Sequence, residues 1–283
     1  MDVEILFDTP VSPNLKDGDS SVTCSYPLST RLADGSICCV YRQGSWKHSP
    51  DGIAVMQTSE DLGASWSSPR TVFDGRHLQP GRMVITAAPC QTQDGNLLVA
   101  FGAVDGLESN IYVFSEEGKD LLRPLLVTHS NDNGLSWDEP TSLSMPPLLN
   151  PGVTSRPFAL PDGEVCLPLE CKLTPQGPNG TAMAFSQDHG CTFGPPIIVA
   201  ADPSDRLNLC DGRFTRLPDG RLLAMLWTFR QDDEETIEVH QSFSSDRGRT
   251  WTEPTNTGFV GQITAPLALS DGRLVAASNY RLP

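Results

Sequence analysis

One turn motif recurs four times in this chain and divides it into similar units. The frame Ser-x-Asp-x-Gly-x-Ser/Thr-aromatic runs from Ser59 to Trp66, from Ser130 to Trp137, from Ser186 to Phe193 and from Ser244 to Trp251. Asp and Ser side chains bond nearby backbone amides and Gly accepts a positive φ, so this frame suits a tight turn between two strands. The copies start 71, 56 and 58 residues apart, and a spacing of that size indicates a repeated supersecondary unit.

A second repeat alternates with the first. Asp-Gly pairs precede apolar runs at Asp34-Gly35, Asp94-Gly95, Asp162-Gly163, Asp219-Gly220 and Asp271-Gly272. An Asp-Gly pair between two apolar runs is a strong signal for a β-hairpin. The two repeats together describe an up-and-down unit of four strands with two tight turns at one end. Such units repeated around an axis make an all-β propeller.

We therefore expect a single β-propeller domain over residues 1–283. Its blades are expected at residues 24–72, 83–144, 155–199, 212–257 and 264–283. The fifth blade is expected to be incomplete, because no Ser-x-Asp-x-Gly turn follows Asp271-Gly272. Four blades and part of a fifth do not close a ring, so the expectation is a chain truncated at its C-terminal end. A smaller closed ring that uses a strand at residues 3–7 is the alternative.

Composition limits the partners. The net charge is −15, whereas nucleic acids and anionic membranes are bound by basic faces, so neither is expected as a partner. No apolar run reaches transmembrane length and no leader segment opens the chain. The eight cysteines lack metal-ligand spacing, which indicates buried thiols in a reducing compartment and not a zinc site. We expect a monomer without metal or cofactor, with the cytoplasm favoured and an export signal upstream of this sequence left open.

Candidate site residues lie at the blade end opposite the repeated turns, where variable loops commonly hold function. The candidates are catalytic His48, Asp51 and Asp211, and ligand-binding Arg42, Arg156, Arg213, Trp227, Arg230 and Arg281; Glu170 and Lys172 lie at the same end. Arginine presents a planar fork that suits a carboxylate. Asp51 would serve as acid and base if partial burial raised its pKa. The expectation is one cleft at the propeller axis, and the alternative is a set of surface charges that contribute little.

The repeated turns resemble the Asp-boxes, or BNR repeats, of the sialidase (neuraminidase) superfamily. The resemblance covers residues 26–283, and residues 212–227 are similar to a divergent bacterial sialidase-like subgroup. It implies a six-bladed propeller. It also implies glycoside hydrolysis by a Tyr nucleophile with a Glu beside it, an Asp acid/base and three Arg on the carboxylate of sialic acid, a departure from the usual pair of carboxylates.

This sequence matches only part of that catalytic set. Asp51 stands where the acid/base Asp is expected, and Asp211 aligns with the Glu. The position of the first Arg is occupied by Ser25, and Tyr280 is the late candidate for the Tyr. The resemblance therefore implies a sialidase-type hydrolase (an exo-alpha-sialidase) that acts on a terminal acidic sugar, with a glycan as its ligand. The alternative is a non-catalytic propeller that binds a glycan or a protein.

Overall fold

The computed structural model describes all residues except 1–8, 13–20, 80, 119 and 280–283. The described chain is built from antiparallel strands and includes two short 3-10 helices, η2 (Gly75–His77) and η3 (Glu116–Gly118). Its internal contacts separate two units, each described below by itself. Unit 1 contains residues 1–143, 156–163 and 189–191, and unit 2 contains residues 144–155, 164–188 and 192–283. Among the described residues, no helix has the length and apolar character that crossing a membrane requires.

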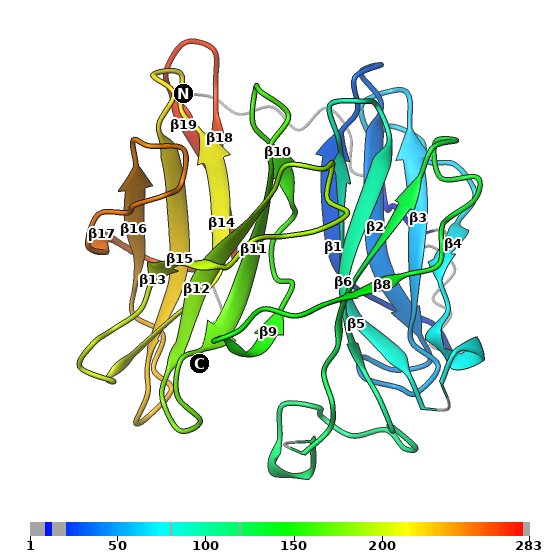
Figure 1. The fold of residues 1–283 in the computed structure, drawn as a ribbon, viewed down its shortest axis with the longest axis horizontal. Coiled ribbons are helices and arrows are strands. Elements are labelled where there is room, and N and C mark those ends of the chain that lie inside the picture. The colour runs from blue at the N-terminus through cyan, green and yellow to red at the C-terminus, as the bar shows by residue number, and fades with distance from the viewer. Residues whose placement is uncertain (1–8, 13–20, 80, 119, 280–283) are drawn as a thin grey trace. The chain divides into compact units, whose positions relative to one another are not determined.

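Unit 1 contains two four-stranded sheets (Figure 1). Their strands, in chain order and in sheet order, are β1 (Thr23–Arg31), β2 (Ile37–Gly44), β3 (Ile53–Ser59) and β4 (Arg70–Phe73), then β5 (Met83–Gln91), β6 (Leu97–Val104), β7 (Leu125–Ser130) and β8 (Thr141–Leu143). The short β10 (Phe158–Ala159) also belongs to this unit. One apolar cluster joins the two sheets and includes Val40 and Met56 of the first and Val99 and Phe101 of the second. The two blades therefore pack against each other through their faces.

Unit 2 contains the remaining sheets. Its strands are β9 (Leu149–Gly152), β11 (Val165–Lys172), β12 (Asn179–Ser186) and β13 (Ile197–Ala200), then β14 (Leu207–Arg216), β15 (Leu222–Arg230), β16 (Glu238–Ser244) and β17 (Thr255–Val260), and finally β18 (Gln262–Ala268) and β19 (Leu274–Asn279). The β14–β17 sheet is up-and-down, and β18 and β19 form a two-stranded sheet. The all-β fold with four full blades and part of another is confirmed. The expected strand at residues 3–7 lies outside the described residues.

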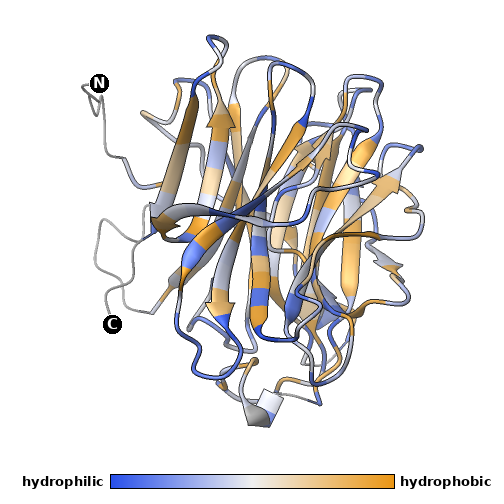
Figure 2. Cartoon of the chain, turned by 90° about the vertical axis from the view of Figure 1, so that its left-hand side faces the viewer, coloured by the Kyte–Doolittle hydropathy of each residue, from blue (hydrophilic) through white to orange (hydrophobic). Residues whose placement is uncertain are grey.

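Central strands of the blades are buried on both faces. Every residue of β6 (Leu97–Val104) is buried, as are all but two residues of β11. Such strands read as continuous apolar runs without alternation, because neighbouring material covers both faces. Figure 2 shows apolar residues mainly along the strands and polar residues mainly in the connecting loops. The longest loop of unit 1, residues 105–124, connects β6 to β7.

The four Asp-box turns are held by their own side chains. In the last copy, Ser244 Oγ donates to Asp246 Oδ1 (2.9 Å) and accepts from Gly248 N (2.7 Å). Thr250 donates from its backbone N to Asp246 Oδ1 (2.8 Å) and from its hydroxyl to Oδ2 (2.6 Å). Equivalent bonds hold the carboxylates of the other three copies, Asp61, Asp132 and Asp188. The expected structural role of these carboxylates is confirmed.

The backbone of the Asp-box departs from the sequence expectation in one respect. The glycine was expected to be the residue with positive φ, but the residue before it also adopts the left-handed region. These residues are Leu62 (φ 60°), Asn133 (57°), His189 (60°) and Arg247 (65°). A non-glycine residue adopts this conformation at a cost. The hydrogen bonds around the Asp carboxylate offset that cost in every copy.

Removing one of these carboxylates should weaken the blade that contains it. The hydrogen bonds from Thr250, then Ser244, lower the pKa of Asp246 to about 2, so the carboxylate is ionised when it bonds. We expect Asp246→Ala to reduce the free energy of unfolding by about 1–2 kcal/mol, because exposed hydrogen bonds contribute modestly. Urea unfolding of this variant beside Glu253→Ala, an exposed carboxylate outside the turn, measures the effect. Equal stability of the two variants would contradict the turn role.

The cysteines behave as small apolar residues. All eight are among the described residues, none of them forms a disulfide, and six are buried. Burial raises the pKa of Cys38, Cys39, Cys90 and Cys171 to about 12. These thiols stay protonated and fill the core, which agrees with their position in apolar runs of the sequence.

Candidate functional site

Arg42, at the end of β2, holds a loop of unit 1 in place. Its side chain is fully buried. Nε donates to Val84 O (2.9 Å), Nη1 to Trp46 O (2.8 Å), and Nη2 to Ser49 O (2.9 Å) and Ser49 Oγ (3.1 Å). A guanidinium that donates to three backbone carbonyls has few N–H groups available to bind a ligand. The geometry favours a positioning role for Arg42 over the expected carboxylate clamp.

Asp51 closes the same loop. Ser45 N lies 3.0 Å from both carboxylate oxygens, and Ser45 Oγ donates to Oδ1 (3.1 Å). Burial raises the pKa of Asp51, but hydrogen bonds from Ser49 and Ser45 outweigh burial and leave the pKa below its usual value. The condition for an acid role of Asp51, a pKa raised by partial burial, is therefore not met. An Asp51 that stays ionised suits a base or an electrostatic partner, and not a proton donor.

His48 is an internal residue with both ring nitrogens bonded. It is fully buried, Nδ1 accepts from Val113 N (3.3 Å), and Nε2 lies 2.9 Å from Tyr26 Oη. With Nδ1 as an acceptor, Nε2 carries the proton and donates to Tyr26. Burial, assisted by the charge of Lys47, lowers the pKa of His48 to about 4. A neutral, doubly bonded imidazole supports its surroundings and is poorly placed for the expected catalytic role.

Unit 2 brings together two carboxylates and an arginine. Asp211 and Arg213 lie on β14 at a bulge between Cys210 and Arg213, and Asp211 has a φ of 49°. Asp211 N donates to Glu170 Oε2 (3.3 Å), next to the end of β11. Arg213 Nη1 donates to Asp211 O (3.2 Å) and lies 4.0 Å from Asp211 Oδ1. We call Glu170, Asp211 and Arg213 the carboxylate group of unit 2.

A glycine makes this close approach possible. A Cβ atom at Gly212 would lie 2.8 Å from the Thr181 methyl group, which real side chains do not tolerate. Thr181 is fixed by a bond from its hydroxyl to Leu209 O (2.9 Å). The bulge at Asp211 and Gly212 changes the direction of β14 locally, and Asp211 thereby lies next to Glu170 near the end of β11. Bulges are common beside functional sites.

The electrostatics of the carboxylate group favour a state in which one proton is bound, on Glu170. Burial raises the pKa of Glu170 to about 8, and the negative charge of Asp211 acts in the same direction, while Arg213 and Lys172 oppose them. Burial also lowers the pKa of Arg213, which both carboxylates counteract. Glu170 is therefore protonated at neutral pH beside a charged carboxylate. A buried carboxyl group whose pKa is raised next to a second carboxylate is a common arrangement for a proton donor.

Sequence reasoning placed Glu170 at the right end of the blade without assigning it chemistry. The missing signal was the contact between the end of one strand and the middle of another. Glu170 comes near the end of one strand and Asp211-Gly212 interrupts the next blade's first strand. The contact between them depends on a bulge, which is not visible as a sequence pattern.

The remaining candidates have separate surroundings. Trp227 on β15 donates from Nε1 to Thr236 Oγ1 (3.3 Å). Arg230 is exposed and pairs with Glu235 (2.5 Å), so it makes a surface ion pair of little energetic weight. Arg156 is only partly exposed, and no acceptor or carboxylate among the described residues pairs with it. Arg281 lies outside the described residues.

The candidates divide between the two units. Arg42, His48, Asp51 and Arg156 belong to unit 1, whereas Asp211, Arg213, Trp227 and Arg230 belong to unit 2. Within unit 2 the structure brings Asp211 and Arg213 together and leaves Arg230 at the exposed end of β15. A single cleft that all of them share stays a prediction.

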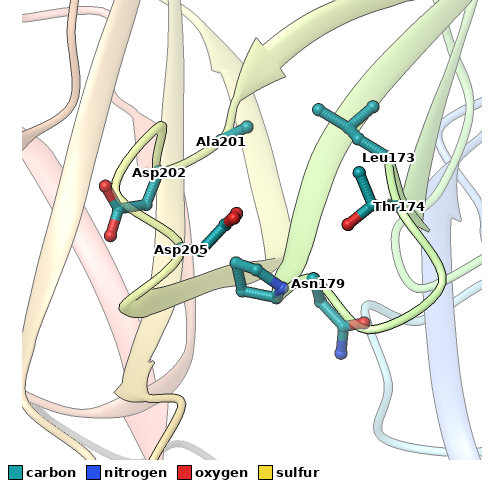
Figure 3. A pocket seen from close by; sticks show the side chains of 8 residues that line it. Leu173, Thr174, Asn179, Ala201, Asp202 and Asp205 are labelled. Carbon is teal, nitrogen blue, oxygen red and sulfur yellow. The ribbon is translucent and has the colours of Figure 1, made fainter.

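A shallow pocket lies beside the loop that follows β11 (Figure 3). Leu173 and Thr174 form one side, and Ala201, Asp202 and Asp205 form the other. Asp202 accepts hydrogen bonds from Ser204 N (2.9 Å) and Leu207 N (2.9 Å). Its carboxylate therefore stabilises its own turn, and the chemistry of this end of unit 2 rests with the carboxylate group.

Comparisons with known proteins identify the family. The model of the BNR repeat-like domain matches residues 113–283. A solved structure of a protein of unknown function from Dyadobacter fermentans is 21% identical, with a TM-score of 0.76 over 93% of this chain and 77% of that chain. The comparison with curated protein sequences gave no match.

Two solved structures of enzymes share the fold. The Hadza microbial sialidase Hz136 is 17% identical, with a TM-score of 0.69 over 89% of this chain and 50% of that chain. The intramolecular trans-sialidase from Ruminococcus gnavus is 12% identical, with a TM-score of 0.66 over 88% of this chain and 75% of that chain. This chain thus spans half the length of the first enzyme and three quarters of the second. The family match and the repeated blades show that the chain belongs to the BNR repeat-like domain family and has a divergent sialidase-type β-propeller fold.

Proposed function

We propose that this chain is a glycoside hydrolase of the sialidase type that acts on a terminal acidic sugar. The observation that supports it is the contact of Glu170, Asp211 and Arg213, in which burial and Asp211 raise the pKa of Glu170. The proposed substrate class is supported by sialidases with the same fold, and the structure of the Ruminococcus gnavus trans-sialidase is in complex with oseltamivir carboxylate, a ligand that bears a carboxylate. A glycan with a terminal carboxylate-bearing sugar is therefore the proposed ligand.

Each member of the carboxylate group has a proposed role. Glu170 donates its proton to the glycosidic oxygen, which leaves with the aglycone as its bond to the anomeric carbon breaks. The charge of Asp211 stabilises the oxocarbenium character that develops on the sugar. Arg213, 13% exposed at its side chain, binds the carboxylate of the sugar. Water then adds its oxygen to the anomeric carbon and returns one proton to the Glu170 carboxylate.

Two residues of unit 1 also have proposed roles. Arg156 lacks a carboxylate partner among the described residues and is a second candidate for binding an anionic substrate. Asp51 is a proposed base, because hydrogen bonds from Ser49 and Ser45 keep its pKa low in spite of burial.

Hydrolysis of two fluorogenic substrates tests the proposal. The 4-methylumbelliferyl glycoside of N-acetylneuraminic acid should be cleaved, and the corresponding neutral β-galactoside should not. Glu170→Gln should lower turnover by about 10²- to 10⁴-fold, because it removes the proton donor. Glu253→Gln, a change at an exposed carboxylate, is the matched control and should leave turnover unchanged. Wild-type turnover in the Glu170 variant, or no cleavage by the folded protein, would overturn the assignment.

The second candidate function is a propeller that binds a glycan or a protein without catalysis. It is favoured by the internal bonding of Arg42 and His48, which leaves the first blade with few free catalytic groups. Calorimetric titration with 3′-sialyllactose distinguishes the two functions. Saturable heat without any released sialic acid would favour the binding module.

A further inference from the structure

We propose that unit 1 carries, built from its own residues alone, a sugar-binding surface for a neutral pyranose. The surface consists of Trp46, Tyr112 and Phe114, which we call the aromatic platform. Their exposed fractions are 42%, 51% and 52%. Three large, half-exposed aromatic residues in one cluster are uncommon on a surface without a binding role. This inference does not depend on hydrolysis at Glu170.

The platform is built around the buried ring of His48. The His48 ring lies 5.1 Å from the Tyr112 ring in a stacked arrangement. It meets Phe114 and Trp46 edge to face at 5.6 Å and 6.2 Å. Because both nitrogens of His48 are bonded, to Tyr26 and to Val113 N, the central ring is held rigidly. The exposed rings therefore have a fixed support, which reduces the ordering cost of binding.

Two cations fix the loops that bear the platform. Lys47 Nζ lies 5.4 Å from the centre of the Tyr26 ring and 6.0 Å from that of Tyr112. Arg123 Cζ lies 5.0 Å from the centre of the Phe114 ring, and Nη2 donates to Val113 O (2.5 Å). Cation–π contacts of this kind stabilise aromatic side chains at the surface. They connect the loop after β2 with the long loop after β6 into one surface.

The size of the platform fits a sugar better than a protein. An aromatic side chain has an area of about 200 Å², so three half-exposed ones offer about 300 Å². A specific protein partner needs about 800 Å² on each side. A pyranose ring has one apolar face of C–H groups and a rim of hydroxyls. Its face would lie on the rings, while the polar tips of Tyr112 and Trp46 and the ammonium group of Lys47 meet the rim.

The charge around the platform favours a neutral sugar. The exposed carboxylates Glu108 and Glu117 belong to the same loop as Tyr112 and Phe114. They balance the charges of Lys47 and Arg123, so the surface lacks the excess of positive charge that an acidic sugar would need.

Titration with lactose and maltose as probes tests the platform, with sorbitol as an acyclic control. Saturation-transfer NMR should give signals from the C–H protons of a disaccharide, and the tryptophan fluorescence should change saturably in the millimolar range. Tyr112→Ala and Trp46→Ala should each weaken binding about tenfold, since an aromatic contact is lost. Tyr112→Phe keeps the ring and should bind nearly as well as the wild type.

Two control variants show whether a loss of binding is specific to the platform. Leu135→Ala changes a 75% exposed apolar residue outside the platform and should leave binding unchanged. Glu170→Gln should also leave it unchanged, so loss of hydrolysis and loss of platform binding are independent results. Circular dichroism checks that each variant is folded.

Three outcomes would overturn the proposal. They are the absence of saturable binding to lactose and maltose, equal binding by sorbitol, and full binding by Tyr112→Ala. If light scattering shows that Tyr112→Ala changes the oligomeric state while sugar binding stays absent, the platform is a protein-contact surface instead.

Discussion

Arg42→Met lowers the free energy of unfolding by about 2–4 kcal/mol in urea titrations, although Met is similar in length and apolar. The substitution removes four hydrogen bonds from the guanidinium to Val84, Trp46 and Ser49. Those bonds connect β2, β5 and the loop after β2, so their loss affects two blades of unit 1. Because Arg42 is fully buried, water does not replace the lost donors without opening the structure.

The glycines around Arg42 provide a matched comparison. A Cβ atom at Gly44 or Gly52 would overlap the guanidinium or the Ser49 hydroxyl. Gly52→Ala should therefore also destabilise the wild type, and should do so less when combined with Arg42→Met, since the crowding is gone. Arg42→Lys keeps the charge but loses the planar guanidinium group. Its free energy of unfolding should therefore lie between those of the wild type and of Arg42→Met. Wild-type stability of Arg42→Met would mean that the guanidinium is dispensable, which would reopen a ligand role.

Glu170→Gln stabilises the protein near pH 8 and has little effect near pH 5. The pKa of Glu170 is raised from 4.5 to about 8, by burial first and by Asp211 second. Between these values the unfolded chain releases the proton while the folded chain keeps it, so stability falls as the pH rises. The variant lacks this ionisation, and its advantage should grow to about 2–4 kcal/mol near pH 8.

Thermal unfolding of wild type and variant across this pH range measures the difference. Glu253→Gln, at an exposed position, should follow the wild type at every pH. Asp211→Asn removes one cause of the raised pKa and should flatten the wild-type pH dependence in part. The stability difference between Glu170→Gln and the wild type could be the same near pH 5 and near pH 8. That result would contradict a protonated Glu170 and would remove the support for its proton-donor role.

The fold was predictable because its signals are local. The Ser-x-Asp-x-Gly frame contains nearly all the groups that close its own turn, as the bonds from Ser244 and Thr250 to Asp246 illustrate. The Asp-Gly pairs likewise mark turns closed by short-range backbone bonds, as from Gly35 N to Leu32 O (2.9 Å) and from Leu32 N to Ser36 O (2.8 Å). Four-stranded blades follow from counting such turns.

The candidate site was less predictable because it depends on contacts between distant residues. Arg42 and Asp51 were placed at the blade end opposite the Asp-boxes. The sequence did not indicate that the Arg42 guanidinium would donate its hydrogen bonds to backbone carbonyls. The pKa of Asp51 depends on hydrogen bonds that outweigh burial, and the pKa of Glu170 depends on burial next to Asp211. The balance of burial and hydrogen bonding has no counterpart in the order of residues.

The self-contained bonding of the Asp-box has a consequence for how this chain folds. The bonds to the carboxylate of each turn join residues no more than four positions apart, as from Asp246 to Thr250. Closing so short a loop costs little chain entropy and takes place much faster than the meeting of distant strands. We therefore expect each Asp-box to form early and the third and fourth strands of its blade to pair next to it. The pairing of β6 with β7 is expected later, because it requires closure of the loop of residues 105–124.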